Sequence, residues 1–400
     1  MRNKSRSLLT GFGVFWGVFM LVVLIGGGRG LRELLQKNFA GYATNSAMVW
    51  SQPTSKAYHG LPKGRRWSMD YRDVERIAEQ VPQLDNVAPL LFAGARTAVK
   101  GERTSSCNVS GVTPDYTGIL APVIRYGRYI NQLDIEQGRK VCVIGKRIYN
   151  DLFPEGGDPC GSPLRIDSIY YEIVGVDFRS GNSVSIGGPP DEGVTVPLTV
   201  VQRFYNRGSE VDIIAVTGRP GVVMSTLTDR IRNVVARAHT IDPTDEQGIM
   251  VFNTEVLFGM LDNLFRGVNF LVWLVGLGTL LAGAIGVSNI MMVTVRERTS
   301  EIGIRRAIGA TPRMIMGQIV AESVALTAVA GMSGIMFAVF VLQMLELANT
   351  VDGVASVAFQ VDFLTALLAA SMLCLLGGLA GLAPAWRAMK VKPVDAMREE

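Results

Sequence analysis

The sequence predicts a membrane protein in which four transmembrane α-helices carry one large α+β domain outside the membrane. Of its 400 residues, 48% are hydrophobic and only 18% are charged, whereas soluble domains carry charge on about a quarter of their residues. The apolar residues are gathered into blocks, and four blocks reach the ~20 residues that cross a ~30 Å hydrocarbon core. The four predicted transmembrane helices are residues 8–28, 267–295, 314–345 and 363–385.

The first apolar block has a second interpretation, as a cleaved signal peptide. Arg2, Lys4 and Arg6 precede it, as basic residues precede the apolar part of a signal sequence. The block 8–28 is longer than the usual ~7–15 apolar residues of such a sequence, and no small-residue cleavage site follows it. We therefore expect a retained helix, with residues 1–7 as a cytoplasmic N-terminus.

Lysine and arginine are distributed unevenly around the four blocks, which predicts the orientation of the chain. The N-terminus, residues 296–313 and the tail 386–400 are basic, whereas residues 346–362 contain neither lysine nor arginine. Because short basic segments stay on the cytoplasmic side of a membrane, we expect both termini and residues 296–313 in the cytoplasm. Residues 30–266 then form a periplasmic domain of a multi-pass protein of the inner membrane, and 346–362 form a short outer loop.

The basic residues do not predict nucleic-acid binding. A protein that binds nucleic acid carries them clustered on a soluble domain, whereas here they flank the apolar blocks. We therefore attribute the positive charge to topology and to the lipid membrane, and we expect no nucleic acid partner.

The periplasmic segment alternates between strand-like and helical patterns. A strand–helix–strand order near its start returns near its end, which suggests one split, porter-like α+β layer, with a β-rich insert at about 116–205 between the two parts. A run rich in Gly, Ser and Pro, Gly181–Gly193, is expected to be an exposed loop. The predicted strands are Ala43–Trp50, Val87–Val99, Lys140–Ile144, Leu164–Ile166, Tyr170–Val176, Asp212–Thr217 and Ile249–Phe252, and the predicted helices are Asp70–Gln80, opened by Ser68 or Asp70, and Val222–Ala238.

Catalytic and metal-binding motifs are missing from the sequence. There is no CxxC, CxxH or HExxH spacing, no phosphate-binding loop and no Gly-x-Ser-x-Gly elbow, so we expect no catalytic residue, no metal and no cofactor. Cys142 and Cys160 are a candidate disulfide, because a strand at 140–144 and a turn at 158–161 could be neighbours in a compartment that permits disulfides. Free thiols are the alternative, since sequence alone does not fix the pairing.

Glu322 is the one ionisable residue in the four predicted transmembrane helices. An ionisable residue within a membrane suggests a transport role. Glu322 also lies only ten residues after Pro312, near the cytoplasmic end, where it could face solvent or pair with an arginine. Both roles remain open from the sequence.

The basic segment between the second and third transmembrane helices is predicted to be a short helix and not a flexible linker. Glu301 precedes Arg305 by four residues, an order that stabilises a helix by ~0.2–0.5 kcal/mol. A helical wheel separates two sides: Arg298, Ile302, Arg305 and Arg306 on one, and Ile304, Ala307 and Ile308 on the other.

The ends of this helix are also visible in the sequence. Gly309 is suited to end it, and Thr311 with Pro312 supplies an N-cap and a first-turn proline for the next helix. The simplest interpretation is a basic amphipathic turn at the membrane surface. The residues themselves favour a more specific one.

The sequence R-E-R-T-S-E-I-G-I-R-R-A-I-G-A at 296–310 closely resembles the cytoplasmic loop of FtsX-like, MacB-type ABC transporter permeases. The resemblance extends over the chain. It continues in Gln318 with residues 321–323, in P-A-W-R-A at 384–388 with P-V-D-A-M-R at 393–398, in R-S-L-L-T at 6–10 with the following residues 11–17, and more weakly in residues 156–161 and 171–176.

The resemblance implies a subunit with four transmembrane helices that works as a homodimer, or as a heterodimer with a related permease, together with two ATPase subunits. It also implies that the loop holds a coupling helix that docks on the ATPase. The residues that this assigns to coupling are Glu297, Arg298, Glu301, Ile302, Arg305, Arg306 and Ile308.

Permeases of this family convert ATP-driven closure in the cytoplasm into movement in the periplasm, which is called mechanotransmission. In MacB-type members the movement drives efflux through a periplasmic adaptor and an outer-membrane channel, and in others it releases lipoproteins or regulates cell-wall hydrolases. This sequence shows no ATPase domain before its first transmembrane helix, so a separate ATPase chain is expected. We expect efflux or export, with a subunit that releases lipoproteins or regulates cell-wall hydrolases as the alternative within the family. A membrane sensor or scaffold without an ATPase, and a membrane-bound enzyme, are the alternatives from other classes.

Overall fold

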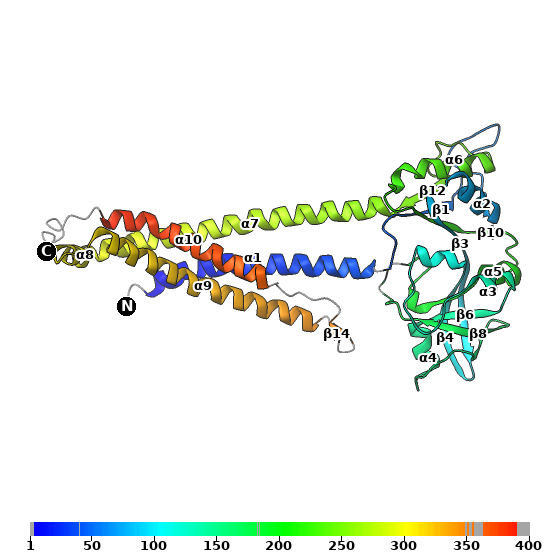
Figure 1. Ribbon diagram of the computed structural model, residues 1–400, viewed down its shortest axis with the longest axis horizontal. Helices are drawn as coiled ribbons and strands as arrows, with labels where there is room; N and C mark the ends of the chain where they lie inside the picture. Colours follow the sequence, from blue (N-terminus) through cyan, green and yellow to red (C-terminus); the bar gives the residue numbers. More distant parts are fainter. Residues whose placement is uncertain are drawn as a thin grey trace. The chain divides into compact units, whose positions relative to one another are not determined.

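The computed structural model describes residues 4–39, 41–181, 183, 185–348, 350–351, 354–355 and 363–389. The chain divides into two compact units, residues 1–35 with 263–400, and residues 36–262. The first unit is helical, and the second is built on a ten-stranded sheet (Figure 1).

The helical unit holds four long apolar helices. Each contains a stretch that is long and apolar enough to cross a membrane. The helices extend beyond the predicted blocks. Each block was ended at the first charged residues beside an apolar stretch, whereas a helix continues through such residues. They are α1 (Lys4–Asn38), α7 (Thr254–Glu297), α9 (Pro312–Ala348) and α10 (Phe363–Met389), with the short helix α8 (Thr299–Ala307) between α7 and α9 and a small β13 (Thr350–Val351) and β14 (Val354–Ala355) hairpin after α9.

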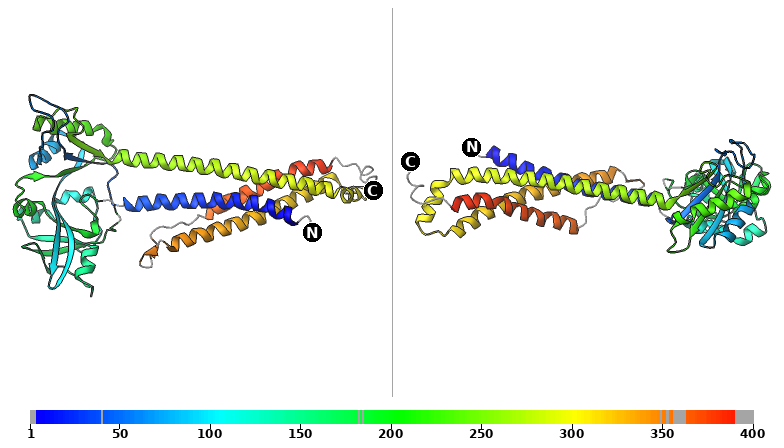
Figure 2. Two further views of the ribbon diagram at one scale, coloured as in Figure 1. Left: turned by 180° about the vertical axis from the view of Figure 1, so that it is seen from behind. Right: turned by 90° about the horizontal axis from the view of Figure 1, so that it is seen from above.

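Small residues let these helices approach closely. A methyl group at Gly334 of α9 would lie 2.7 Å from the carbonyl oxygen of Phe15 in α1. The Ser323 hydroxyl of α9 donates to the carbonyl oxygen of Gly377 in α10 at 2.8 Å. Such contacts are typical of helices that associate in a membrane, where lipid removes the hydrophobic driving force. The helices α1, α7, α9 and α10 lie alongside one another, and the start of α1 and the end of α10 lie toward the end that carries α8 (Figure 2).

The second unit has one sheet with the strand order β12-β1-β11-β3-β4-β9-β6-β8-β5, and β7 pairs with β3 and β8. A short β2–β10 pair, Met69–Asp70 with Glu210–Val211, lies apart from it. The strands of the sheet are β1 (Ser46–Ser51), β3 (Leu84–Lys100), β4 (Arg103–Val112), β5 (Ile124–Gly127), β6 (Val141–Gly145), β7 (Pro163–Ile166), β8 (Ile169–Asp177), β9 (Gly193–Pro197), β11 (Ile213–Gly218) and β12 (Ile249–Asn253).

Both ends of the periplasmic segment contribute to one half of this sheet. Strand β1 pairs antiparallel with β11 and β12, and β3 pairs with β11. Helices α2 (Tyr71–Gln80) and α6 (Thr228–His239) pack on this half through buried residues such as Ile77 and Ile231. The predicted split α+β layer is confirmed. Asp70 is the N-cap of α2, and α6 follows a 3-10 turn, η3 (Met224–Thr226), so it begins later than predicted.

The insert is β-rich, as predicted, but its strands continue the main sheet. Strand β9 pairs in parallel with β4 and antiparallel with β6. Strands β2, β4, β5, β9 and β10 were not predicted from the sequence. Nor were the short helices η1 (Pro114–Gly118), α3 (Gln132–Glu136), α4 (Lys146–Leu152), η2 (Pro190–Glu192) and α5 (Leu198–Phe204). Helices α4 and α5 cover one face of the insert, where Ile148 and Val201 pack with Ile144.

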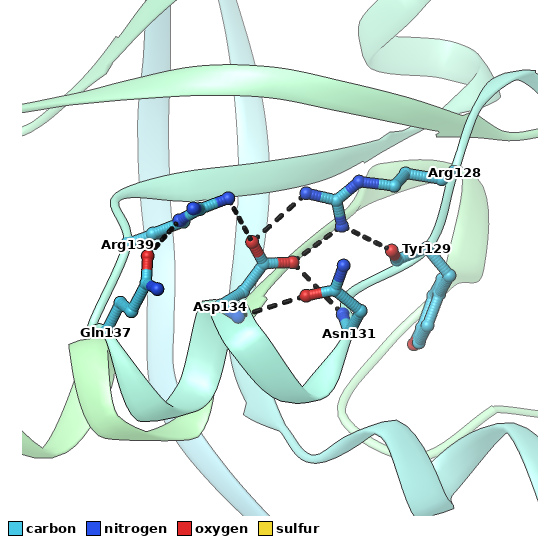
Figure 3. A network of polar contacts seen from close by, with 6 residues as sticks. All are labelled: Arg128, Tyr129, Asn131, Asp134, Gln137 and Arg139. Atoms are coloured by element: carbon cyan, nitrogen blue, oxygen red, sulfur yellow. Dashed lines mark hydrogen bonds and ion pairs between the residues drawn. The ribbon is translucent and has the colours of Figure 1, made fainter.

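The start of α3 is held by a buried carboxylate (Figure 3). Arg128 donates to Asp134 through Nη1 at 2.6 Å and Nη2 at 3.1 Å, and the backbone N–H of Asn131 donates at 3.0 Å. Arg139 Nη1 lies 3.9 Å from the same carboxylate. Burial acts to raise the pKa of Asp134, but the hydrogen bonds from Arg128 and Asn131 outweigh it and hold this pKa below its usual range.

The sequence left a Cys142–Cys160 disulfide and free thiols as alternatives, and in the structure both residues are free thiols. Cys142 lies fully buried on β6. The Cys160 sulfur packs against Gly127 of β5, and β8 lies between β6 and β5 in the sheet. Strands are spaced about 4.8 Å apart, so a thiol on β6 and one against β5 do not reach disulfide distance.

Candidate functional site

The short helix α8 joins the ends of α7 and α9, and its own end is sharply defined. Gly309 has φ +109°. The backbone N–H groups of Gly309 and Ala310 donate to the carbonyl oxygens of Arg306 at 3.2 Å and Arg305 at 3.0 Å. A glycine at this position reaches a positive φ at little cost, which is why helices so often end there. The predicted helix end is confirmed.

The next helix begins as predicted. Pro312 is the first residue of α9. The N–H of Met314 donates to the Thr311 hydroxyl at 3.4 Å and to the Thr311 carbonyl oxygen at 3.0 Å. The segment is therefore two helices with a tight turn between them and contains no long flexible linker.

One side of α8 is fixed to the first turns of α9. Ile302 is 9% exposed and packs in a buried cluster with Ile315 and Ile319. Arg305 donates through Nη1 to Gln318 at 2.8 Å and through Nη2 to Glu301 at 2.7 Å. The predicted Glu301–Arg305 pair therefore forms, and Arg305 also bridges to α9.

Glu322 is the partner of Arg298. Arg298 Nη1 lies 3.2 Å and 3.4 Å from the two carboxylate oxygens of Glu322. The two side chains are 50% and 42% exposed, so this pair contributes only ~0–1 kcal/mol to stability. Of the two roles open from the sequence, the structure supports pairing with an arginine.

Arg306 connects α8 to the last helix. Its Nη1 donates to the carbonyl oxygen of Met389 at 2.9 Å, and Met389 is the last residue of α10. The P-A-W-R-A motif lies in the last turns of α10, where Ala385 and Ala388 are fully buried. The P-V-D-A-M-R motif at 393–398 lies outside the described residues.

The opposite side of α8 exposes apolar side chains. Ile304 is 50% exposed and Ile308 is 82% exposed. A surface helix normally turns its apolar residues toward the protein, and apolar residues grouped on a surface mark a site of interaction. The two exposed isoleucines make this side of α8 a candidate docking surface.

The structure thus brings most of the predicted site residues together around one helix. Arg298, Glu301, Ile302 and Arg305 face α9, Arg306 reaches α10, and Ile308 faces outward. Glu297 is the last residue of α7. Gln318 and Ile304 also belong to this group, although neither was predicted as a site residue. Gln318 belongs to the resembling stretch of α9, and Ile304 shares the wheel side of Ile308, so both signals were present.

Two family models match the chain over most of its length. The model of the MacB-like periplasmic core domain matches residues 7–234, and that of the FtsX-like permease C-terminal matches residues 273–393. The chain belongs to the MacB-like, FtsX-type permeases.

Two curated relatives match the permease over its whole length. The macrolide export ATP-binding/permease protein MacB of Bdellovibrio bacteriovorus is 28% identical over 406 residues, covering 100% of this permease and 60% of the relative. The pyoverdine export ATP-binding/permease protein PvdT of Pseudomonas entomophila is 29% identical over 402 residues, covering 100% and 58%. The permease thus spans about 60% of the length of these relatives.

Among solved structures, the chain matches the periplasmic region of MacB from Actinobacillus actinomycetemcomitans. It has 15% sequence identity and a TM-score of 0.45, and the match covers 58% of the permease and 98% of that chain. With its family and its four apolar helices, the permease is a multi-pass protein of the inner membrane with a MacB-like periplasmic domain.

Among the described residues, no three His, Cys, Asp or Glu side chains are grouped to hold a metal ion.

Proposed function

We propose that this permease is the membrane subunit of an ABC transporter, in which a separate cytoplasmic ATPase drives movement of the periplasmic domain for efflux or export. The observation that carries the proposal is the arrangement of α8. Its arginine side is fixed to α9 and α10, while Ile304 and Ile308 are exposed on the other side.

This arrangement suits a part that receives force. A groove on an ATPase would cover the exposed isoleucines, and a push on α8 would pass to α9 and α10 through Ile302, Arg305 and Arg306. Packed helices respond to such a push by shifting between discrete arrangements. The proposal therefore assigns the coupling role to Glu297, Arg298, Glu301, Ile302, Arg305, Arg306 and Ile308, together with Ile304 and Gln318.

The proposed assembly has two ATPase subunits and two permease subunits, as a homodimer or a heterodimer. The proposed topology places both termini and residues 296–313 in the cytoplasm. Support comes from the basic residues of these segments, and from the position of α8 at the end of the bundle where α1 starts and α10 ends (Figure 2). Export is favoured because two relatives are named for the export of macrolides and of pyoverdine. A periplasmic adaptor and an outer-membrane channel complete the proposed path.

The test is a change of the exposed side of α8 alone. We expect Ile304→Asp with Ile308→Asp to abolish co-purification of the ATPase in mild detergent and to remove the effect of the permease on ATP hydrolysis. The fold should remain, because both side chains are exposed. Val223→Asp is the matched control, because Val223 is likewise 50% exposed but lies in the periplasmic unit.

The alternative of a sensor or scaffold predicts a different result. The wild-type permease would then purify as a dimer without an ATPase, and the double variant would behave as the wild type. Either finding would exclude the coupling role of α8.

A further inference from the structure

A cavity of about 100 Å³ lies on the sheet of the periplasmic unit, on the face opposite helices α4 and α5. Side chains alternate between the two faces of a strand. Ile144 and Val194 pack with α4 and α5 on one face, so their neighbours Val143 and Thr195 lie on the other. Asn108 and Ser110 of β4 line the cavity together with Thr195 of β9.

Residues 185–190 form the roof of this cavity. Gly187 has φ +89° and Gly188 has φ +126°. A methyl group at Gly187 would collide with the ring of Phe92, and one at Gly188 would lie 2.7 Å from the amide nitrogen of Asn108. Only glycine permits this backbone to lie so close to the sheet. The run that the sequence predicts as an exposed loop therefore covers a polar part of the sheet.

A buried ion pair lies in the cavity wall. Asp177 is 4% exposed and Arg179 is 9% exposed. Asp177 Oδ2 accepts from Arg179 Nε at 2.6 Å and lies 2.6 Å from Arg179 Nη2. Asp177 Oδ1 accepts from the backbone N–H groups of Val123 and Arg179, both at 3.1 Å. The carboxylate thus has four N–H donors, which uses its acceptor capacity.

Arg179 keeps one donor that this carboxylate does not satisfy. Its Nη1 is buried and has no hydrogen-bond partner among the described residues. A buried donor without an acceptor bears the full cost of its desolvation, and native proteins leave few such groups. Since Asp177 is saturated, the group that completes this site must bring an acceptor, and an anionic acceptor forms the stronger bond with a guanidinium.

We propose that this cavity binds a small carboxylate, with its oxygens toward Arg179 and its short apolar part against Leu90, Phe92 and Val143. The hydroxyls of Ser110 and Thr195 are neutral partners for such a ligand. A water molecule needs ~10–15 Å³ of cavity, so about 100 Å³ admits on the order of seven water-sized groups. This matches the non-hydrogen atoms of a four- or five-carbon acid, and it is too little for a drug-sized molecule, which occupies ~300–1,000 Å³.

The first experiment uses three ligands of nearly equal size with the full chain in lipid nanodiscs and a carboxylate-free buffer. Butyrate is anionic, butyramide is neutral, and butylamine is cationic. We expect saturable butyrate binding in calorimetry or ligand-observed NMR, at least tenfold weaker butyramide binding, and no butylamine binding. No saturable butyrate binding, or equal binding of the three, would overturn the proposal.

The second experiment locates the site. Arg179→Gln should weaken butyrate binding at least tenfold. This change also removes a buried ion pair and could disturb the fold, so a second variant is needed. Ser110→Leu fills the cavity and leaves Asp177 and Arg179 in place. It should weaken butyrate binding by a similar factor. Arg230→Gln, on the exposed surface of α6, should bind as the wild type does. Unchanged butyrate binding in folded Ser110→Leu would contradict the site. The readout does not involve an ATPase, so it is independent of the coupling proposal.

Discussion

The contacts between α8 and α9 predict a graded opening of α8 when their charges are reversed. The perturbation is Arg298→Glu together with Arg305→Glu. It removes the Arg298–Glu322 pair at 3.2 Å, the Arg305–Gln318 hydrogen bond at 2.8 Å and the Arg305–Glu301 pair at 2.7 Å. The buried side chain of Ile302 remains, so α8 should stay helical and stay attached for most of the time.

The size of the effect follows from the exposure of the side chains. Arg298 and Glu322 are 50% and 42% exposed, and Arg305 and Glu301 are 48% and 54% exposed. Exposed pairs of this kind contribute ~0.2–1 kcal/mol each, and helix i,i+4 pairs ~0.3–0.5 kcal/mol. The Arg298–Glu322 pair and the Arg305–Gln318 hydrogen bond hold α8 to α9, and the Glu301–Arg305 pair stabilises the helix itself. Together they stabilise the closed, helical state of α8 by roughly 1–2 kcal/mol. Since 1.4 kcal/mol is a factor of ten, the open population should rise about tenfold.

Hydrogen–deuterium exchange of the full chain in nanodiscs measures this opening directly. We expect the α8 amides to exchange about tenfold faster in the double variant, with α6 unchanged. The charge swap Arg298→Glu with Glu322→Arg keeps the pair in reverse and should exchange more slowly than Arg298→Glu alone. The reasoning is refuted if the double variant exchanges as the wild type does, or if the swap restores nothing.

Three further predictions concern the periplasmic unit. Asp134→Ala removes the hydrogen-bond partner of Arg128 and of the Asn131 N–H, and it should lower the unfolding free energy by ~1–3 kcal/mol in urea titration, because Arg128 is 41% exposed and stays solvated. Asp229→Ala, at a side chain that is 79% exposed, should change it by less than ~0.5 kcal/mol. Burial raises the pKa of Asp134 and Asp245, but hydrogen bonds outweigh it and lower both below 3.8 in the folded state. A carboxyl group with a lowered pKa stabilises the fold at pH values above its unfolded pKa, and this stabilisation is lost as the pH falls through its folded pKa. The Tm should therefore be flat near neutrality and fall below about pH 4, and the fall should be smaller in Asp245→Asn. Burial raises the pKa of Cys107 to about 11 and raises that of Cys142 further. Both thiols should therefore resist labelling by iodoacetamide at pH 7 in the native protein. In urea without a reductant, mass spectrometry should find all four cysteines labelled.

Local signals in the sequence identified most of the helical structure and its ends. Asp70 caps α2, Gly309 ends α8, and Pro312 begins α9. Each of these depends on the chemistry of one residue and its immediate neighbours. The Glu301–Arg305 pair was also visible from spacing alone. What the sequence could not supply is the partner of each arginine across helices, because Gln318 and Met389 are brought to α8 only by folding.

The strands that the sequence missed have short or weak local patterns. In β4, Arg103–Val112, every second residue from 105 to 111 is buried, but Ser105 and Gly111 stand at two of these positions. The alternation of apolar and polar residues that marks a half-buried strand is therefore limited to Cys107 and Val109 with their polar neighbours. Strand β9 is only five residues long and ends at Pro197. It is fixed by parallel pairing with β4, a contact between segments far apart in the chain. Local sequence patterns fail to predict strands whose residues deviate from the usual alternation, and such deviations are often found at functional sites.

The helix α8 shows the same relation between an unexpected pattern and function. Its arginines look from the sequence like charges that set the topology of the membrane. In the fold, Arg298 and Arg305 also hold the helix to α9, and Arg306 holds it to α10. Ile304 and Ile308 are left on the open side. The charged side of α8 makes internal contacts, so its isoleucines are exposed. Exposure of these apolar side chains to water is unfavourable while α8 has no partner. The cost is recovered only when another surface covers these side chains, and this is why we infer that α8 acts together with a partner.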